Sequence, residues 1–187
     1  MNDFSPPSAE RPPHPLAIAV IERLSGRKGA RVLEIGTGSG RNTRALAAAG
    51  FIAESYDDLP RPGCAAGLST HALLHGTPHT IAQRLRDVFA LVEPGAPLYA
   101  TFGSVHDARY GKGERIEDHV FAPLDGDEAG VGHAFFDRSR LQALLEEQWI
   151  VESLDEVAVD AIAGRWAHPQ APLSGAVHWF AIARRRG

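Results

Sequence analysis

The chain has 187 residues, 44% of them hydrophobic and 22% charged, which is the composition of an ordinary globular protein. Its formal net charge of −4 gives no sign of a basic surface for nucleic acid, and no apolar stretch is long enough to cross a membrane. The single cysteine, Cys64, excludes an internal disulfide and a multi-cysteine metal site. The N-terminus lacks a signal-peptide pattern, so we expect a cytoplasmic protein.

The first half of the chain alternates between helix and strand patterns after a proline-rich start. Residues 1–15 hold five prolines and few large apolar side chains, so we expect them to be flexible. Residues 16–187 are expected to form a single domain, because no composition break divides them. The predicted elements of this half are helices over 16–25 and 41–49 and strands over 30–36 and 51–57.

The second half continues this alternation and closes with two strands. The predicted elements are strands over 64–70, 97–104, 149–159 and 175–185 and helices over 77–93 and 135–148, capped by Thr77 and Asp137. Residues 105–134 are rich in glycine and charge and are predicted to form a long loop. The pattern predicts an α/β fold, Rossmann-like and three-layered (α/β/α), with a mostly parallel twisted sheet and an antiparallel C-terminal strand.

The stretch ARVLEIGTGSGRNTRALAAAGF, residues 30–51, places an acid and three glycines between a strand and a helix. Ligands of open parallel sheets bind at the carboxyl ends of the strands, where glycines allow close approach to the backbone. Dinucleotide loops follow G-x-G-x-x-G, but here Arg41 occupies the third glycine position. The acid before the glycines, Glu34, instead suits a ligand with an ammonium group, such as S-adenosylmethionine. Backbone amides near Gly36 to Gly38 would accommodate its carboxylate.

A second acid, Asp57, follows the strand predicted over 51–57. A carboxylate at that place can accept hydrogen bonds from both hydroxyls of a ribose. The alternative is a solvated turn carboxylate, because Asp57-Asp58-Leu59-Pro60 is also favourable turn chemistry.

Taken together, these stretches resemble the class I S-adenosylmethionine-dependent methyltransferases, particularly the small-molecule type with a methyltransferase 11-like domain. The matching segments are VLEIGTGSGRNTRALAAAGF, GLSTHALLHGTP, LVEPGAPLYATFGS and HWFAIARR, and the resemblance spans roughly residues 15–187. It implies S-adenosylmethionine as the cofactor, methyl transfer as the activity and a small molecule as the acceptor. The cofactor-binding positions that it implies are Glu34, Gly36, Thr37, Gly38, Gly40, Asp57, Asp58, Ser69 and Thr70.

One unit of that family is missing from this chain. The family places a helix and a strand between its second strand and the LST segment, but only DLPRPGCAA separates Asp57 from Gly67. We therefore expect about six strands rather than seven and a more open adenine side, where Asp58 would replace a lost acidic side chain. The alternative is that the second strand itself is the missing piece. If that strand is present it forms an edge, which a partner subunit of a homodimer or the N-terminus is expected to cover.

His71 follows the LST segment and would face the methyl group in such an enzyme, so it is the candidate general base. The competing interpretation, which we favour, is a histidine hydrogen-bonded at the end of a strand. The acceptor pocket is expected to draw on the N-terminal helix, the 105–134 loop and the loop before the last strand. Its candidate lining residues are Tyr110, His133, Phe136, Arg165, Trp166 and His168.

A metal site is not expected. His71, His75 and His79 have the four-residue spacing of helical metal ligands, but Gly76 and Pro78 interrupt any helix there.

Two other functions stay open at this point. The first is a degenerate, non-catalytic protein of the same fold with weak or no cofactor binding, which the missing unit favours. The second is a nicotinamide-dependent oxidoreductase, against which Arg41 and the absence of a separate catalytic domain count.

Overall fold

The computed structural model of the chain describes residues 12–159 and 175–187. Most of the proline-rich start, residues 1–11, and three of the expected pocket residues, Arg165, Trp166 and His168, lie outside the described residues. Within the described ranges, no helix combines the length and the apolar character that a membrane span requires.

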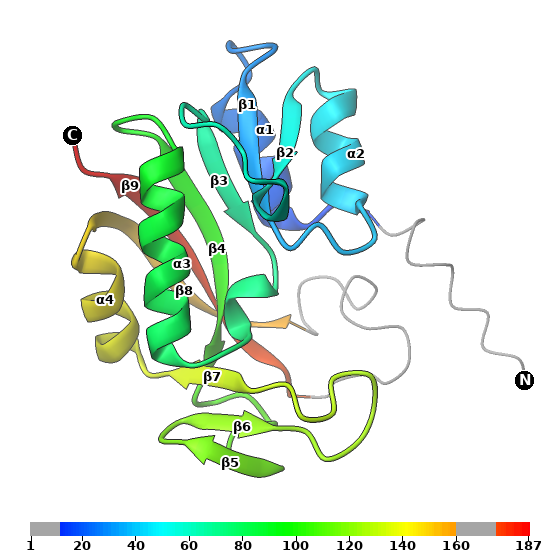
Figure 1. Ribbon diagram of the computed structural model, residues 1–187, viewed down its shortest axis with the longest axis vertical. Helices are drawn as coiled ribbons and strands as arrows, with labels where there is room; N and C mark the ends of the chain where they lie inside the picture. The colour runs from blue at the N-terminus through cyan, green and yellow to red at the C-terminus, as the bar shows by residue number, and fades with distance from the viewer. Residues whose placement is uncertain (1–11, 160–174) are drawn as a thin grey trace, which may run out of the picture.

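The sheet has nine strands in the described residues, rather than the six or so expected, and six of them follow one another in the order β2-β1-β3-β4-β9-β8 (Figure 1). They are β1 (Arg31–Ile35), β2 (Ile52–Ser55), β3 (Ala66–Ser69), β4 (Pro97–Ser104), β8 (Trp149–Ala158) and β9 (Val177–Arg185). Neighbouring strands pair in parallel except at β9, which runs antiparallel to both β4 and β8. The predicted mostly parallel sheet with an antiparallel last strand is therefore confirmed.

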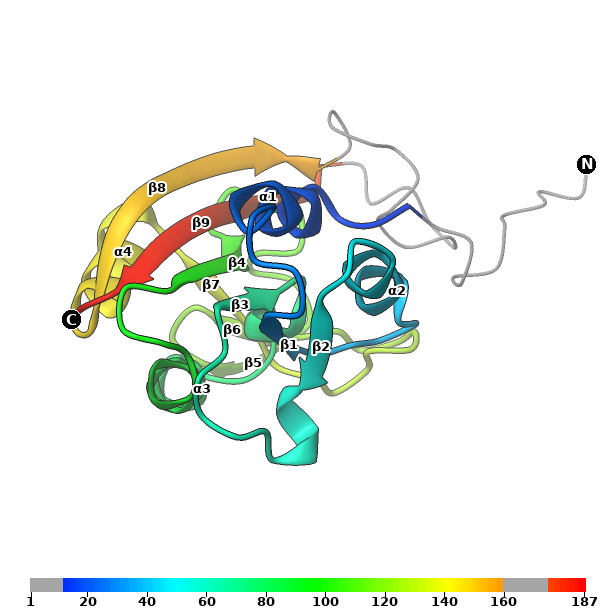
Figure 2. The ribbon, with the colours of Figure 1, turned by 90° about the horizontal axis from the view of Figure 1, so that it is seen from above.

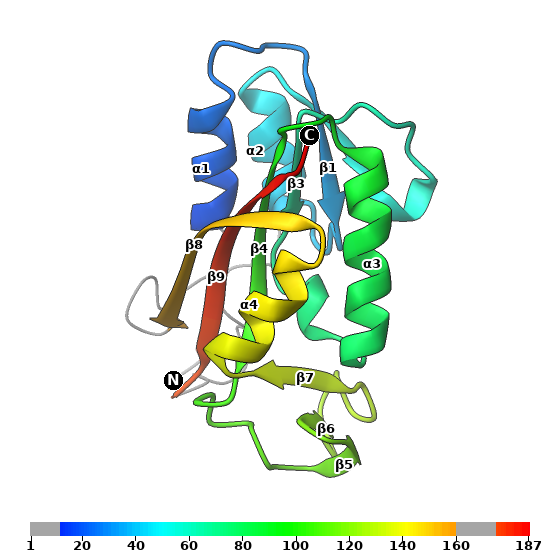
Figure 3. The same ribbon diagram turned by 90° about the vertical axis from the view of Figure 1, so that its left-hand side faces the viewer.

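The helices cover both faces of this sheet (Figures 2 and 3). On one face lie α1 (Pro15–Arg23) and α2 (Arg41–Ala48), and on the other lie α3 (Pro78–Leu91) and α4 (Arg138–Glu146). Two helix starts follow their predicted caps, because the side chains of Thr77 and Asp137 accept hydrogen bonds from the backbone amides three residues further on. The three-layer arrangement is confirmed.

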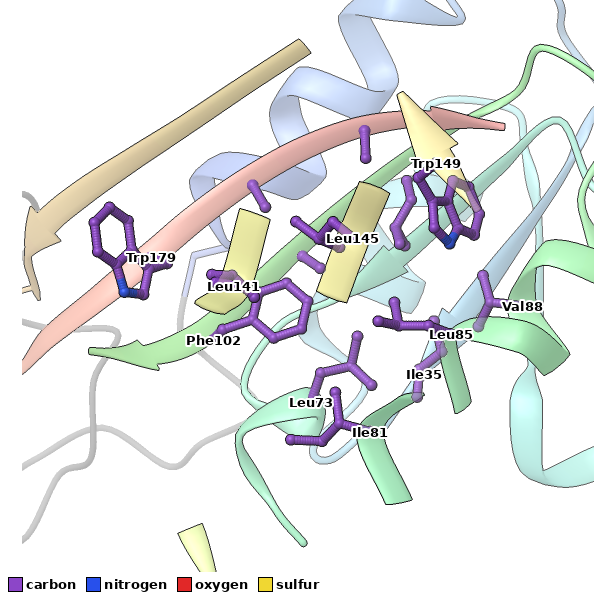
Figure 4. Close-up of a cluster of buried hydrophobic side chains, with 14 of the residues drawn as sticks. Ile35, Leu73, Ile81, Leu85, Val88, Phe102, Leu141, Leu145, Trp149 and Trp179 are labelled. Carbon is purple, nitrogen blue, oxygen red and sulfur yellow. The ribbon is translucent and has the colours of Figure 1, made fainter. Parts of the chain in front are cut away.

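Each face of the sheet has its own apolar core. Under α1 and α2, Leu16, Val20 and Leu46 pack in a cluster that includes Val32 and Leu68 of the sheet. The opposite core is the larger one, and Figure 4 shows some of its side chains: Ile35, Leu73, Ile81, Leu85, Val88, Phe102, Leu141, Leu145, Trp149 and Trp179. The two cores hold the sheet rigidly, so that the carboxyl ends of β1, β3 and β4 have fixed positions.

Residues 105–134 do not form the long loop expected from the sequence. They contain the short strands β5 (Glu114–Glu117) and β6 (Val120–Ala122) and the start of β7 (His133–Phe136). These strands pair antiparallel, and β7 joins the end of β4 in parallel, which gives nine strands in the described part of the chain. The sequence pattern missed them because each has three or four residues and every residue of β5 is exposed. The helix predicted over 135–148 also begins later, because Phe135 and Phe136 belong to β7.

The chain passes from β2 into β3 without the helix and strand that the resemblance would place there. β2 is followed by a single turn of 3-10 helix, η2 (Tyr56–Asp58), and a loop that enters β3. β2 pairs with β1 in register, with Ser55 beside Glu34, so the second strand is present and the shortening falls after it. Among the described residues β2 pairs only with β1 and is an edge strand, and its expected cover stays a prediction.

Candidate functional site

Three left-handed glycines turn the chain between β1 and α2. Gly36, Gly38 and Gly40 have φ values of 74°, 50° and 74°, a conformation that residues with a side chain disfavour. Gly40 is also the residue that precedes the first turn of α2. The loop therefore joins the carboxyl end of a central strand to the amino end of a helix, where backbone amides lack partners within the helix.

The three glycines differ in the space around them. A Cβ atom at Gly36 would lie 2.4 Å from Cβ of Ala72, which begins the 3-10 helix η3 (Ala72–Leu74) after β3. A Cβ atom at Gly40 would lie 3.2 Å from Nη1 of Arg44, whereas one at Gly38 meets nothing within 4 Å. The loop is therefore closed at Gly36 and open at Gly38.

Glu34, near the carboxyl end of β1, is fully buried. Its Oε2 accepts a hydrogen bond from the Thr43 hydroxyl at 2.6 Å, and its Oε1 has no hydrogen-bond partner. Burial raises the pKa of this carboxyl, although the Thr43 hydroxyl, the nearby Asn42 side chain and the charge of Arg41 act in the opposite direction. A buried oxygen without a donor is costly, and a ligand ammonium is one group that would satisfy it. In this structure direct contact would require the surrounding side chains to open, because Glu34 has no exposed surface.

Asp57 and Asp58 are exposed on η2, immediately beyond β2. The backbone amide of Asp57 donates to the Ser55 hydroxyl at 3.2 Å, and Ser55 lies beside Glu34 in the sheet. The two acids thus follow the strand next to the glycine loop, as ribose binding requires. The hydrogen bond to Ser55 is also typical of a simple turn with solvated carboxylates, so the roles of Asp57 and Asp58 stay predictions.

Ser69 and Thr70 lie at the end of β3, beside Ile35 of β1. The Ser69 hydroxyl is buried and has no hydrogen-bond partner, so it is a second polar atom that a ligand could satisfy. The Thr70 hydroxyl instead accepts from the amide of Asn42 at 2.9 Å. Asn42 in turn accepts from the backbone amide of His14 at 2.9 Å, which connects the starts of α1 and α2 with β3. Asn42 was not predicted as a site residue, because its only signal in the sequence is a polar side chain on the inner side of a short helix.

His71 has a left-handed backbone, with φ of 76°, and its amide donates to the Thr101 hydroxyl at 2.8 Å. Such a conformation is strained for a residue with a side chain, and strained residues collect at functional sites. The His71 ring meets those of His14 and His178 edge-on, at centroid distances of 5.6 and 5.3 Å. The structure therefore places the candidate base in a cluster of three histidines.

His14 is held neutral within this cluster. It is fully buried, and its Nδ1 accepts a hydrogen bond from the backbone amide of Leu16 at the start of α1. Burial lowers its pKa to about 3, and the nearby Arg41 and His178 act in the same direction. A neutral His14 adds no charge of its own to the histidine cluster.

A buried ion pair supports the other side of the cluster. Asp107, in the turn after β4, accepts three hydrogen bonds from Arg109 and one from the amide of Val177 at the start of β9. Burial alone would raise the pKa of Asp107, but the hydrogen bonds and charge of Arg109 lower it overall. Arg109 also donates to Nε2 of His178 at 3.0 Å, so His178 carries its proton on Nδ1.

The other sequence candidates divide between core and surface. Phe136 is buried in the larger core, and Cys64 is a buried thiol whose pKa burial raises. Tyr110 stacks on His119 and donates to or accepts from its Nδ1 at 2.8 Å. The spaced histidines separate, because His75 contacts His133 while His79 is exposed on α3.

The sheet order, the antiparallel β9 and the acid–glycine loop at the tip of β1 define the fold of the class I S-adenosylmethionine-dependent methyltransferases. The assignment of the fold rests on similarity to solved structures, because no family model and no curated protein sequence matches the chain.

A SAM-dependent methyltransferase of Methanosarcina mazei is 16% identical, with a TM-score of 0.69 and coverage of 94% of this chain and 99% of that one. A 1,6-didemethyltoxoflavin-N1-methyltransferase of Burkholderia thailandensis, solved with S-adenosylhomocysteine, is 17% identical, with a TM-score of 0.64 and coverage of 96% and 79%. The [4+2]-cyclase SpnF is 15% identical, with a TM-score of 0.57 and coverage of 91% and 80%. The likeness to these proteins shows the fold of this chain and leaves its chemistry to the site.

The residues of the site suit S-adenosylmethionine on the side of its amino-acid end. Two buried polar atoms, Glu34 Oε1 and Ser69 Oγ, have no hydrogen-bond partner, and the backbone at Gly38 is open. Asp57 and Asp58 are exposed, and among the described residues no strand lies beyond β2 on their side of the sheet.

Proposed function

We propose that the chain binds S-adenosylmethionine at the carboxyl ends of β1 and β3 and transfers its methyl group to a small-molecule acceptor. The observation that carries this proposal is the buried Glu34, which has an oxygen without a hydrogen-bond partner and lies two residues before the first left-handed glycine. Glu34 would hold the ligand ammonium, the amides near Gly38 its carboxylate and Asp57 its ribose. The fold and its solved neighbours support the same ligand.

When bound, S-adenosylmethionine supplies a methyl group that its sulfonium already activates, so the protein has to align an acceptor and exclude water. Ser69 and Thr70 would lie beside the methyl group at the end of β3. The imidazole of His71 would take the proton of a hydroxyl or carbon acceptor. The buried Asp107–Arg109 pair and the neutral His14 act as positioning residues, because they fix the rings of the histidine cluster.

A binding experiment tests the proposal. We expect calorimetric titration of the wild-type protein with S-adenosylmethionine and with S-adenosylhomocysteine to give saturable heat, and titration with a reduced nicotinamide cofactor to give none. In Glu34→Gln the affinity should fall about tenfold or more, because a hydrogen bond to a charged group contributes about 1.5–3 kcal/mol. The matched control is Glu117→Gln, which removes an exposed carboxylate on β5 and should leave the affinity unchanged.

One structural observation favours the non-catalytic alternative. Glu34 is fully closed and Ala72 fills the space at Gly36, as in a site that no longer admits a ligand. In that case Glu34→Gln would only remove a buried charge, and neither adenosyl compound would give heat at millimolar concentration. That result would exclude methyl transfer as the function.

A further inference from the structure

A group of metal-ligating side chains lies outside the proposed cofactor site. His75 follows η3, Glu128 lies in the turn between β6 and β7, and His133 is the first residue of β7. Nitrogen and carboxylate atoms of all three lie within 4.8 Å of one another. They come from three separate segments, so the helical spacing considered in the sequence analysis could not reveal the group.

The backbone holds these segments in place. His75 and His133 form an antiparallel β-bridge, and the amide of Gly76 donates to the carbonyl of Gly132 at 2.8 Å. The turn that carries Glu128 is closed by a hydrogen bond of 2.9 Å from the Gly130 amide to the Pro123 carbonyl. Main-chain contacts therefore bring the segments that carry the three side chains together.

Both imidazoles direct Nε2 at the same carboxylate. Nε2 of His133 lies 3.0 Å from Oε2 of Glu128, and Nε2 of His75 lies 3.4 Å from Oε1. Two ligand atoms bound at about 2.1 Å to one tetrahedral ion would lie about 3.4 Å apart. The separations between each histidine and the carboxylate are close to those around a bound ion, and the third separation, between the two histidines, lies within 4.8 Å.

The hydrogen bonds of His133 point to a cation. Its Nδ1 lies 2.8 Å from the Val131 carbonyl, and its Nε2 faces the Glu128 carboxylate, so both ring nitrogens face acceptors. A neutral imidazole carries a single proton and can satisfy only one of them, whereas a ring protonated on both nitrogens would satisfy both. A metal ion between Nε2 and the carboxylate would also satisfy both, with Nδ1 donating to the carbonyl as in most metal-bound histidines.

We infer that His75, Glu128 and His133 bind one divalent transition-metal ion, with Zn²⁺ as the natural occupant. Two imidazoles and one carboxylate form a known ligand set for Zn²⁺ sites that keep a fourth position open. His133 is the anchored ligand, with 4% of its side chain exposed, and the Val131 carbonyl fixes its orientation. His75 and Glu128, with 33% and 30% of their side chains exposed, leave a path for the ion. This inference does not depend on methyl transfer.

The test is a metal titration of the untagged full-length protein after removal of metals with a chelator. We expect Zn²⁺ to give saturable heat for one ion per chain, and Co²⁺ to give the visible absorption of a site with nitrogen ligands. In Glu128→Gln and His75→Gln the affinity should fall at least about tenfold, since even residues that only support ligands contribute that much. His79→Gln, an exposed histidine four residues after His75, should bind as the wild type does.

Circular dichroism of each variant at the start of the titration shows whether it is folded. The inference is overturned if folded wild-type protein gives no heat with Zn²⁺, because the group is then a hydrogen-bonded cluster of protonated histidines. It is also overturned if Glu128→Gln binds as tightly as the wild type, or if His79→Gln weakens binding as much. Failure of S-adenosylmethionine to bind would not affect any of these results.

Discussion

At the scale of single residues, the three loop glycines share a left-handed backbone but differ in how closely neighbouring side chains pack against them. All three avoid the strain that a side chain suffers at positive φ. Only Gly36 also makes room for a neighbour, because Ala72 occupies the volume that a Cβ would need. Gly36 therefore fixes the distance between the glycine loop and η3, whereas Gly38 leaves its side of the loop open.

We predict that Gly36→Ala is markedly more destabilising than Gly38→Ala. Both substitutions place a side chain in the left-handed region, at about 1–2 kcal/mol, and only Gly36→Ala adds overpacking against Ala72, at about 1–3 kcal/mol more. Urea denaturation of the two variants measures the difference in the free energy of unfolding. Ala72→Gly in the Gly36→Ala background should recover part of the loss, and equal losses in the two single variants would contradict the role of Ala72.

The residue scale also shows what the sequence could and could not predict. The glycines, Glu34 and the caps Thr77 and Asp137 were found because their chemistry depends on neighbours along the chain. Ala72 against Gly36, or Asn42 bridging His14 and Thr70, depends on segments that meet only in the folded protein. The His75–Glu128–His133 group was missed for the same reason, and because its acid lies in a region predicted as a loop.

At the scale of elements, α1 begins with a histidine that must stay neutral. The Nδ1 of His14 accepts the Leu16 amide, and Pro15 at the first helical position lacks an amide that would need a partner. A protonated Nδ1 could not accept, and burial adds the cost of a charge. The start of α1, and with it the cluster around His71, is therefore sensitive to acid.

We predict that the protein loses stability below pH 6.5 through His14. The pKa of this histidine is about 3 in the folded protein and about 6.5 when unfolded, so its contribution is complete above pH 6.5 and is lost as the pH falls towards 3. Between pH 7.5 and pH 5 the free energy of unfolding should fall by about 2 kcal/mol more in the wild type than in His14→Asn. Asparagine also caps a helix but does not titrate.

Chemical denaturation at several pH values measures this difference. His79→Asn replaces an exposed histidine on α3 and serves as the control, with the pH dependence of the wild type. Parallel pH profiles for the wild type and His14→Asn would show that His14 is not buried in its neutral form.

Elements with long apolar patterns were predicted to within a few residues, and β4 was predicted over its full length. Each of them packs an apolar face against the sheet or the helices, so its apolar residues recur at a regular spacing in the sequence. β5, β6 and β7 are too short, at three or four residues each, to show such a period, and β5 is also exposed along its whole length. Their pairing with one another defines them, and side-chain patterns do not predict pairing over so few residues.

At the scale of the whole molecule, the sheet stops at β2 where a longer member of the fold would continue. The edge of β2 has only four residues, and Ile52 on it is 52% exposed. Short edge strands resist unwanted pairing but still offer unpaired main-chain groups. Because these unpaired amides and carbonyls can pair with another segment, we expect a second subunit or the N-terminus to cover the β2 edge.

We predict that the β2 edge is protected in solution. Hydrogen exchange should show protection of the outward-facing β2 amides, and light scattering should show whether a dimer accounts for it. Removal of residues 1–11 should abolish the protection if the N-terminus supplies it and leave it unchanged if a partner does. Rapid exchange of these amides in a monomeric full-length protein would contradict both forms of cover.

The early end of the sheet at β2 also predicts which part of the cofactor contributes most of the binding free energy. The groups proposed for the amino-acid end, Glu34 and the glycine loop, are buried or lie at the end of an inner strand of the sheet. Those proposed for the nucleoside end, Asp57 and Asp58, are exposed acids beyond an edge strand, where hydrogen bonds compete with water. Recognition should therefore be concentrated at the ammonium and carboxylate and be weak at the adenine.

We expect 5′-methylthioadenosine, which lacks the amino-acid end, to bind at least about a hundredfold more weakly than S-adenosylhomocysteine. The loss corresponds to two charge-assisted hydrogen bonds of about 1.5–3 kcal/mol each. The inosine analogue of S-adenosylhomocysteine, changed only at the base, should bind within about tenfold of the parent, because an exposed contact contributes little. Competition calorimetry ranks the three ligands. If the inosine analogue loses more affinity than methylthioadenosine, the base is recognised by a built pocket, and the shortened sheet does not have the effect on binding that its topology predicts.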